Sequence, residues 1–315
     1  MKKIVSFIII AALLAASLAA CGQPPEKEEH TGKLSVVSTI FPSYDFARQI
    51  AGEFADVTML LPPGGESHSF EPTPRDIAKI QKCGVFIYGG GESDAWVEKI
   101  LASIDTSKMK IVTLMDCTEV LENESEEEHN APGHVHKEEH VYDEHVWTSP
   151  RNAKLIAEEI LKALCEADAE NSPAYLDNAR EYIAKLDALD QSFQEIAETG
   201  VRRTIIFGDR FPFLYFTRAY GLEHLAAFPG CSHETQASAA TVKELIDKIN
   251  ADKIPVVFHL ELSDTKMAQT ISEATGAQVM LLHACHNISK EDFQAGKGYL
   301  DLMEENLKAL RAALN

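Results

Sequence analysis

Short apolar runs alternate with amphipathic stretches along most of the chain. Runs of this kind, bounded by glycine, proline and small polar residues, are typical of strands that are buried on both faces of a parallel sheet. We predict strands at 34–41, 57–61, 85–88, 111–114, 204–207, 224–228, 255–260 and 277–283.

Between these runs, apolar residues recur every three or four positions, which is the spacing of an amphipathic helix. Thr73-Pro74 and Ser149-Pro150 each place a capping residue before proline, as at many helix starts. The alternation of strand and helix predicts an α/β fold with parallel sheets. We predict helices at 44–51, from Thr73 onward, and at 96–104, 149–164, 172–199, 213–220, 240–249, 264–275 and 298–314.

The chain is longer than one hydrophobic core usually supports. Its 315 residues predict two lobes. The predicted helix at 172–199 would extend roughly 40 Å, far enough to run along both of them as a rigid connector. We expect an N-terminal lobe at 33–150, a helical connector at 151–200 and a C-terminal lobe at 201–315.

The N-terminus has the pattern of an export signal. Two lysines precede an apolar stretch at 4–18, which is too short for a stable membrane span. Leu18-Ala19-Ala20-Cys21 resembles the bacterial lipobox, in which the cysteine is lipidated; an ordinary signal peptide with a chance cysteine is the alternative. We expect a signal peptide at 1–21, a tether at 22–32, and a protein held by lipid on the extracytoplasmic face of the bacterial membrane.

The segment 122–144 is dense in glutamate and histidine and has few apolar residues. This composition predicts an acidic loop without a packed core. The loop either collects metal ions with low affinity or is a solvated linker.

The formal charge is -20, from 49 acidic and 29 basic side chains. A surface this acidic excludes nucleic acid and anionic membranes as main partners and suits a protein that attracts cations.

Four places put a potential metal ligand just after a predicted strand or at a predicted helix start. They are His68, His145, Asp209 in the turn after the 204–207 strand, and His283, with His286 close behind. Ligands bind at the carboxyl edge of parallel sheets, and three imidazoles with one oxygen suit the tetrahedral preference of zinc. Taken together, these residues predict a metal site.

Two motifs resemble those of the zinc/manganese substrate-binding lipoproteins of ABC importers (cluster A-I). The sequence PPGGESHSFEPTP at 62–74 is similar to the first histidine motif of that family. The sequence DEHVWTSPRN at 143–152 is similar to the second, normally Asp-Pro-His-x-Trp-x-Asp-Pro. The lipobox, the acidic loop and the closing segment 299–307 fit as well, so the resemblance covers the whole mature chain.

The resemblance implies two (βα)4-type lobes joined by one helix, with a divalent ion held in the cleft between them and delivered to a membrane permease. The family's third ligand is a histidine or glutamate, but Gly208 stands at that position, so Asp209 is the nearest substitute. By the same resemblance, His283 takes the place of the family's fourth ligand, usually an aspartate.

Several alternatives remain for individual residues. Asp209 pairs with Arg210 or caps the next helix if it is not a ligand. Glu261 is either a ligand, a hydrogen-bond partner of a ligand, or solvated, and His286 is either a ligand or an outer residue that orients His283. Three imidazoles favour zinc over manganese, although manganese is an alternative.

The cysteines allow one disulfide within the predicted sheets. Cys231 and Cys285 both follow strands of the second lobe at the same edge, so a bridge between them is feasible. Cys83 and Cys117 lie at opposite edges of the first sheet, too far apart for a bridge.

We therefore expect an extracytoplasmic receptor, monomeric and not an enzyme, that binds zinc for an ABC permease. A surface adhesin of the same fold and a zinc hydrolase are the alternatives. No His-Glu-x-x-His, Gly-x-Ser-x-Gly or P-loop motif occurs in the chain, which disfavours the hydrolase.

Overall fold

The computed structural model describes residues 32–67, 69–122, 142–228 and 237–315. Leu34–Asn315 forms one compact unit. The predicted signal peptide, nearly all of the tether and of the acidic loop, His68 and Cys231 lie outside the described residues.

The first lobe is built on a four-stranded parallel sheet with the strand order β2-β1-β3-β4. Alternate side chains of the central strands enter two different cores: Val36 and Val85 face one core, whereas Val37 and Phe86 face the other. Both faces of the sheet are therefore covered. The elements are β1 (Leu34–Ser38), α2 (Phe41–Ala51), β2 (Ala55–Met59), α3 (Pro74–Lys82), β3 (Val85–Tyr88), η1 (Glu92–Asp94), α4 (Ala95–Leu101), β4 (Lys110–Thr113) and η2 (Met115–Cys117).

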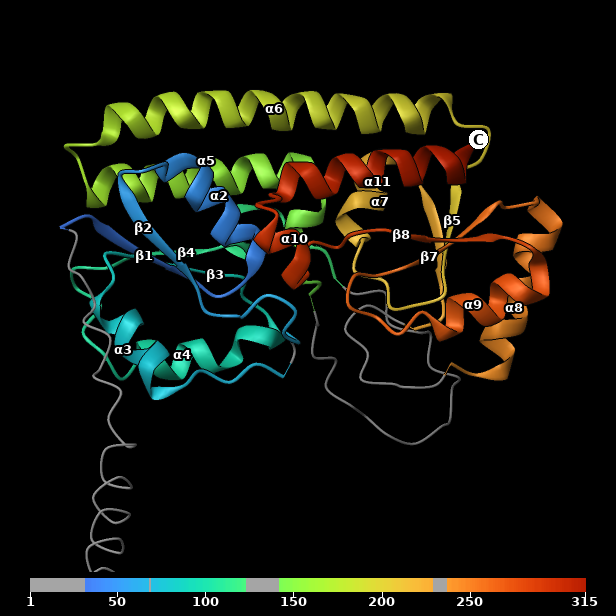
Figure 1. The fold of residues 1–315 in the computed structure, drawn as a ribbon, viewed down its shortest axis with the longest axis horizontal. Coiled ribbons are helices and arrows are strands. Elements are labelled where there is room, and N and C mark those ends of the chain that lie inside the picture. The colour runs from blue at the N-terminus through green and yellow to red at the C-terminus, as the bar shows by residue number, and fades with distance from the viewer. Residues whose placement is uncertain (1–31, 68, 123–141, 229–236) are drawn as a thin grey trace, which may run out of the picture. The chain divides into compact units, whose positions relative to one another are not determined.

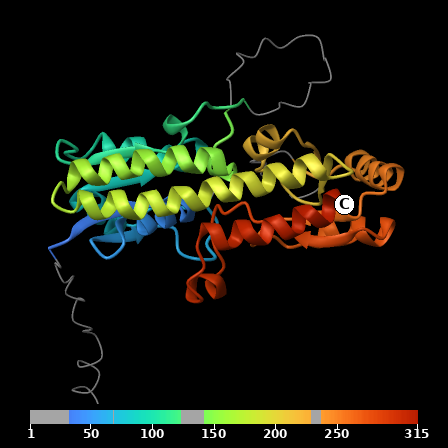
Figure 2. The same cartoon turned by 90° about the horizontal axis from the view of Figure 1, so that it is seen from above.

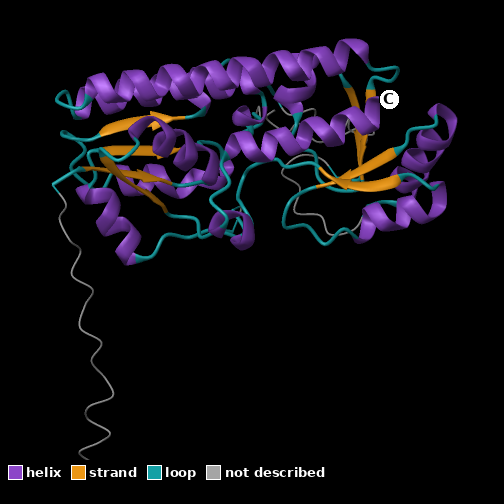
Figure 3. Ribbon diagram, turned by 45° about the horizontal axis from the view of Figure 1, so that its top comes forward, coloured by secondary structure: helices purple, strands orange, loops and turns teal. Residues whose placement is uncertain are grey.

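The second lobe repeats this arrangement with the strand order β6-β5-β7-β8. Figure 3 shows the two sheets as separate groups of orange strands, each with helices packed around it. The elements are β5 (Thr204–Phe207), α7 (Leu214–Tyr220), β6 (Glu223–Ala226), α8 (Ala239–Asp252), β7 (Val256–His259), α9 (Lys266–Thr275), β8 (Gln278–Leu281), α10 (Lys290–Gln294) and α11 (Tyr299–Leu314).

A layer of helices joins the lobes. The chain leaves the first lobe through η3 (Val146–Thr148) and α5 (Pro150–Ala167), and then forms α6 (Ser172–Thr199). Figures 1 and 2 show α6 running past both sheets, beside α5 on the first lobe and α11 on the second. Its buried side chains belong to one core that contains residues of both sheets. The predicted α/β fold of two parallel sheets joined by one long helix is confirmed.

Most of the predicted elements are present, with shifts of a few residues at their ends. The predicted first strand extended to Phe41, but β1 ends at Ser38 and α2 already begins at Phe41, because Pro42 suits the first turn of a helix. The helix α10 was not predicted; the Ser289 side chain caps it by accepting a hydrogen bond from the Asp292 N–H at 3.0 Å. The last strand, β8, ends at Leu281, short of the predicted His283.

No helix within the described ranges is both long and apolar enough to cross a membrane.

The buried face of α6 should contribute strongly to stability, because it packs in the core common to both lobes. Leu186 is fully buried there, whereas Leu176 on the same helix is 49% exposed. We expect Leu186→Ala to lower the free energy of unfolding by about 2–5 kcal/mol, since it leaves a cavity. Urea denaturation followed by circular dichroism measures the change.

Leu176→Ala is the matched control, with the same substitution on the same helix but on the exposed face. It should change the free energy of unfolding by about 0.5 kcal/mol or less. Equal losses for the two variants would show that α6 does not contribute through this core.

Candidate metal centre

Two segments from different parts of the chain meet where the lobes join. The segment 143–148 approaches α5, and the segment 283–288 follows β8. The indole Nε1–H of Trp147 donates to the Ala284 carbonyl at 2.9 Å, and the Tyr299 hydroxyl donates to the Trp147 carbonyl at 2.7 Å. These bonds hold the histidine motif of the first segment against the loop of the second.

Three buried side chains converge at this junction. Glu144, His145 and His286 each offer a ligand atom, and these atoms all lie within 4.8 Å of one another. The centroids of the two imidazole rings are 5.3 Å apart, and the rings are nearly perpendicular. Within the described part of the chain, this is the one group of this kind.

The His145 imidazole is oriented by its neighbour Asp143. One Asp143 carboxylate oxygen lies 3.1 Å from Nδ1 of His145 and also accepts the His145 backbone N–H at 2.8 Å. With Nδ1 engaged in this way, Nε2 is the atom that can bind a metal. Burial acts to lower the pKa of His145, but the charge and hydrogen bond of Asp143, aided by Glu144, raise it above the ordinary value.

Glu144 is fixed by the loop after β3. Its carboxylate accepts a hydrogen bond from the Ser93 backbone N–H at 3.1 Å and another from the Ser93 hydroxyl. This approach requires glycine at position 91, where φ is +74° and a Cβ atom would lie 2.5 Å from Glu144 Oε2. The first lobe thus holds the carboxylate beside His145.

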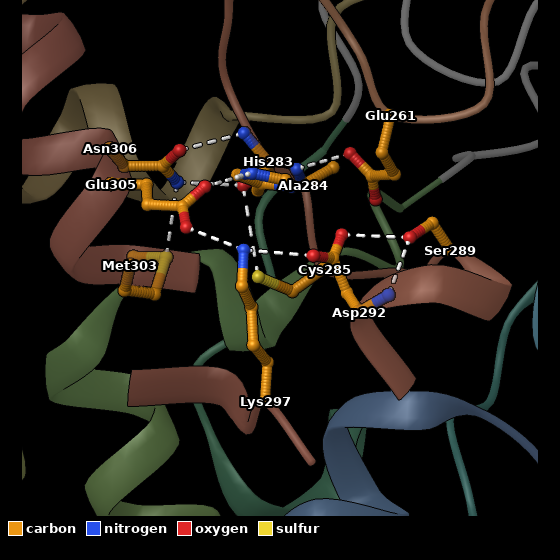
Figure 4. Close-up of polar contacts among 10 residues, drawn as sticks. All are labelled: Glu261, His283, Ala284, Cys285, Ser289, Asp292, Lys297, Met303, Glu305 and Asn306. Carbon is orange, nitrogen blue, oxygen red and sulfur yellow. Dashed lines mark hydrogen bonds and ion pairs between the residues drawn. The ribbon is translucent and has the colours of Figure 1, made fainter. Parts of the chain in front are cut away.

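The loop that carries His286 is shaped by Glu261, which lies just after β7. The Glu261 carboxylate accepts the backbone N–H of Ala284 at 2.7 Å and that of His286 at 3.1 Å. Figure 4 shows the Glu261 side chain directed at Ala284. Between these two amides, Cys285 has a φ of +58°, so the backbone turns there and presents His286 on the side of Glu144. Burial raises the pKa of Glu261, and the backbone N–H groups partly oppose the shift.

The group fits a small divalent cation. A cavity of about 60 Å³ is lined by His145, His286 and Glu261, and by Gly65 and Ser67 on the opposite wall. One water needs only about 10–15 Å³, so there is room for an ion. Tetrahedral zinc ligands lie roughly 3.4 Å apart at ordinary bond lengths, so the observed separations need only a small contraction.

His283 lies outside this group. Its Nε2 lies 3.2 Å from a carboxylate oxygen of Glu305, and its backbone N–H and carbonyl are both hydrogen-bonded to the Asn306 side chain. The ammonium of Lys297 donates to Glu305 at 2.7 Å and pairs with Asp292 at 2.8 Å (Figure 4). The proposed ligand His283 therefore contacts an ion-pair network between α10 and α11.

Asp209 also makes other contacts. Its two carboxylate oxygens accept the backbone N–H groups of Arg210 at 2.8 Å and of Leu260 at 2.9 Å. At position 208, a Cβ atom would lie 2.4 Å from the Cα of Ala268 in α9, so a side chain does not fit there without a shift of the backbone. Asp209 ties the ends of β5 and β7 together.

The structure thus places two of the proposed ligands, Asp209 and His283, outside the group that contains His145. The proposed ligand His68 lies beyond the described residues. Cys285 is buried, and its proposed partner Cys231 lies outside the described residues, so a bridge between them stays a prediction.

Glu144 was missed in the sequence analysis, although a signal was present. It stands where the second family motif normally has proline. A carboxylate directly before the motif histidine can reach the same ion. The replacement of proline by Glu144 therefore pointed to a further candidate ligand. His286 was considered only as one of several alternatives.

Known proteins share this fold and much of this sequence. The family model described as zinc-uptake complex component A, periplasmic (ZnuA), matches residues 36–313. The high-affinity zinc uptake system protein ZnuA of Bacillus subtilis is 33% identical over 311 residues, which cover 98% of this chain and 96% of that protein. The zinc-binding lipoprotein AdcA of Streptococcus pneumoniae is 32% identical over 99% of this chain.

The chain spans only 61% of the length of AdcA. A crystal structure of the Zn(II)-bound ZnuA-like domain of Streptococcus pneumoniae AdcA superimposes with a TM-score of 0.74 and 31% sequence identity. That superposition covers 90% of this chain and 99% of the domain, so the similarity extends over the whole two-lobed fold. The chain belongs to the family of the periplasmic component A of zinc-uptake complexes.

Proposed function

We propose that this protein captures Zn²⁺ in the cleft between its lobes and delivers it to an ABC permease. The proposed ligands are His145, His286 and Glu144, with His68 as a fourth from the first histidine motif. The protein works on the extracytoplasmic side of the membrane, held there by lipid on Cys21. The permease is its membrane partner.

One observation carries this proposal: two imidazoles and a carboxylate from different segments meet in a buried cleft. A divalent cation would bind one atom from each of these three side chains, in addition to the hydrogen bonds that they make within the protein. The relatives support the metal, since AdcA is a zinc-binding lipoprotein and its ZnuA-like domain has been solved with Zn(II) bound.

The donor set favours zinc over manganese. Imidazole nitrogen suits zinc, whereas manganese prefers sites rich in carboxylate oxygen and water. The additional carboxylates near the site, Asp143 and Glu261, are engaged with His145 and with backbone N–H groups. Neither belongs to the group of ligand atoms that lie within 4.8 Å of one another, so the proposed set has one carboxylate.

The same contacts disfavour hydrolysis. A zinc hydrolase needs a carboxylate or imidazole free to activate water beside the metal. Glu261 accepts two backbone amides and Glu144 accepts two hydrogen bonds from Ser93, so neither is poised as a general base. The family, too, consists of transport components.

His286→Ala should weaken zinc binding by at least ~10-fold, because losing a ligand should cost more than losing a residue that only orients one. Competition with a chromogenic chelator, using metal-free protein, measures the dissociation constant.

The matched control is His259→Ala, which removes an imidazole at the end of β7 that is bonded to the Leu260 carbonyl. Its affinity should remain close to that of the unmodified protein. Absence of tight zinc binding by the unmodified protein would refute the proposed function itself.

Glu144→Gln should also weaken zinc binding by at least ~10-fold, because the amide is a far poorer zinc ligand than the carboxylate. The Gln side chain can accept the Ser93 N–H through its oxygen and donate to the Ser93 hydroxyl through its nitrogen, so the fold should be retained. Isothermal titration gives the affinity, and an unchanged value would remove Glu144 from the ligand set.

Zinc affinity should fall as the pH is lowered from about pH 8 to about pH 5, because a proton on His145 blocks its Nε2. Asp143 and Glu144 raise the pKa of this imidazole, so the fall should begin at a higher pH than for an ordinary histidine. Asp143→Asn should move the onset to lower pH. A pH-independent affinity over this range would contradict the assignment.

A further inference from the structure

Asn287, directly after the proposed ligand His286, joins the two walls of the cleft. Its side chain is buried, with 3% of its surface exposed. The amide Nδ2 donates to the Pro62 carbonyl at 3.0 Å and to the Gly65 carbonyl at 2.7 Å. Both acceptors lie in the loop between β2 and α3 of the first lobe.

The orientation of the Asn287 amide is fixed by a hydrogen bond within its own loop. Its Oδ1 accepts the backbone N–H of Ile288 at 2.8 Å, which leaves Nδ2 facing the first lobe. The Ile288 carbonyl in turn accepts the Gly64 N–H at 2.8 Å. Three hydrogen bonds therefore cross between the turn at 62–65 and the loop that carries His286.

The turn that receives these bonds is preformed and exposed. The Gly65 N–H closes it on the Pro62 carbonyl at 2.9 Å, and Gly64 has a φ of +77°. Pro62 is exposed to solvent, so its carbonyl can bind water when the Asn287 bond breaks. The Trp147 side chain that bonds to Ala284, by contrast, is buried.

The two ends of this connection are also parts of the metal cavity. Gly65 and Ser67 line one wall, and His286 and Asn287 line the other. The turn lies in the first histidine motif, upstream of His68 in the sequence. A change in the Asn287 bonds would therefore move the loop that carries His286 relative to Gly65 and Ser67.

We propose that Asn287 is a positioning residue that holds the cleft closed around Zn²⁺ and thereby slows its release. The inference rests on the proposed function, and Asn287 itself does not bind the ion. The structure assigns it the separate task of coupling the His286 loop to the first lobe.

The test compares zinc release from the unmodified protein and from Asn287→Ala, each mixed in stopped flow with an excess of chelator. Removal of the two hydrogen bonds that Asn287 donates across the cleft should raise the dissociation rate by ~10-fold or more. Asn178→Ala is the matched control, because it removes an amide that donates to the Ile50 carbonyl at 3.0 Å away from the cleft. Its dissociation rate should stay at the unmodified value.

Asn287→Asp provides a second variant of nearly the same shape. Its carboxylate has no N–H to donate and faces two carbonyl oxygens, while its negative charge can only favour retention of a cation. Faster release from Asn287→Asp would thus come from the lost donors.

Thermal melts separate positioning from a merely structural role. A structural role would lower Tm equally with and without zinc and leave the release rate unchanged, and that result in the folded variants would overturn the proposal. The proposal expects a smaller zinc-induced rise in Tm together with faster release. Failure of the unmodified protein to bind zinc would instead refute the proposed function.

Discussion

The burial of carboxylates where the two lobes meet is the constraint on which the site depends. Asp143 and Glu144 are buried there and Glu261 is partly buried, and an unpaired carboxylate in such a place would be destabilising. Each is therefore supplied with donors by a neighbouring segment: His145, Ser93, and the amides of Ala284 and His286. Satisfying the carboxylates fixes the loops, and the fixed loops bring the imidazoles together.

The hydrophobic pattern was enough to predict the architecture because the central strands β1, β3, β5 and β7 are mostly buried. An apolar run of four residues between turns, such as 204–207, is too short for a helix and is therefore predicted as a strand. The ends of α6 were also predictable, because a proline lies in its first turn and Gly200 follows its last residue. Element ends were less predictable. The strand β1 ends at Ser38 and not at Phe41 because Phe41 already belongs to the first turn of α2. Where that turn begins depends on contacts with residues distant in the sequence, which the local pattern does not show.

The site was predictable only in part for a related reason. His145 lies in a local motif, so its placement follows from nearby residues. The choice between His283 and His286 depends on a strand that ends at Leu281 and on a left-handed turn at Cys285, and neither is marked by a glycine or a proline. The carboxylate of Glu261, distant in sequence, stabilises that turn. Such long-range pairing cannot be deduced from spacing alone.

The close contact of Gly208 with α9 limits how this ligand set can change. A Cβ atom at this position would overlap the backbone of Ala268, so only glycine fits. A histidine or glutamate at this position would have to shift the backbone of α9, so a single substitution there cannot place a side chain without moving the helix. The packing of α9 against the end of β5 thus restricts position 208 to glycine, independently of any preference among metals.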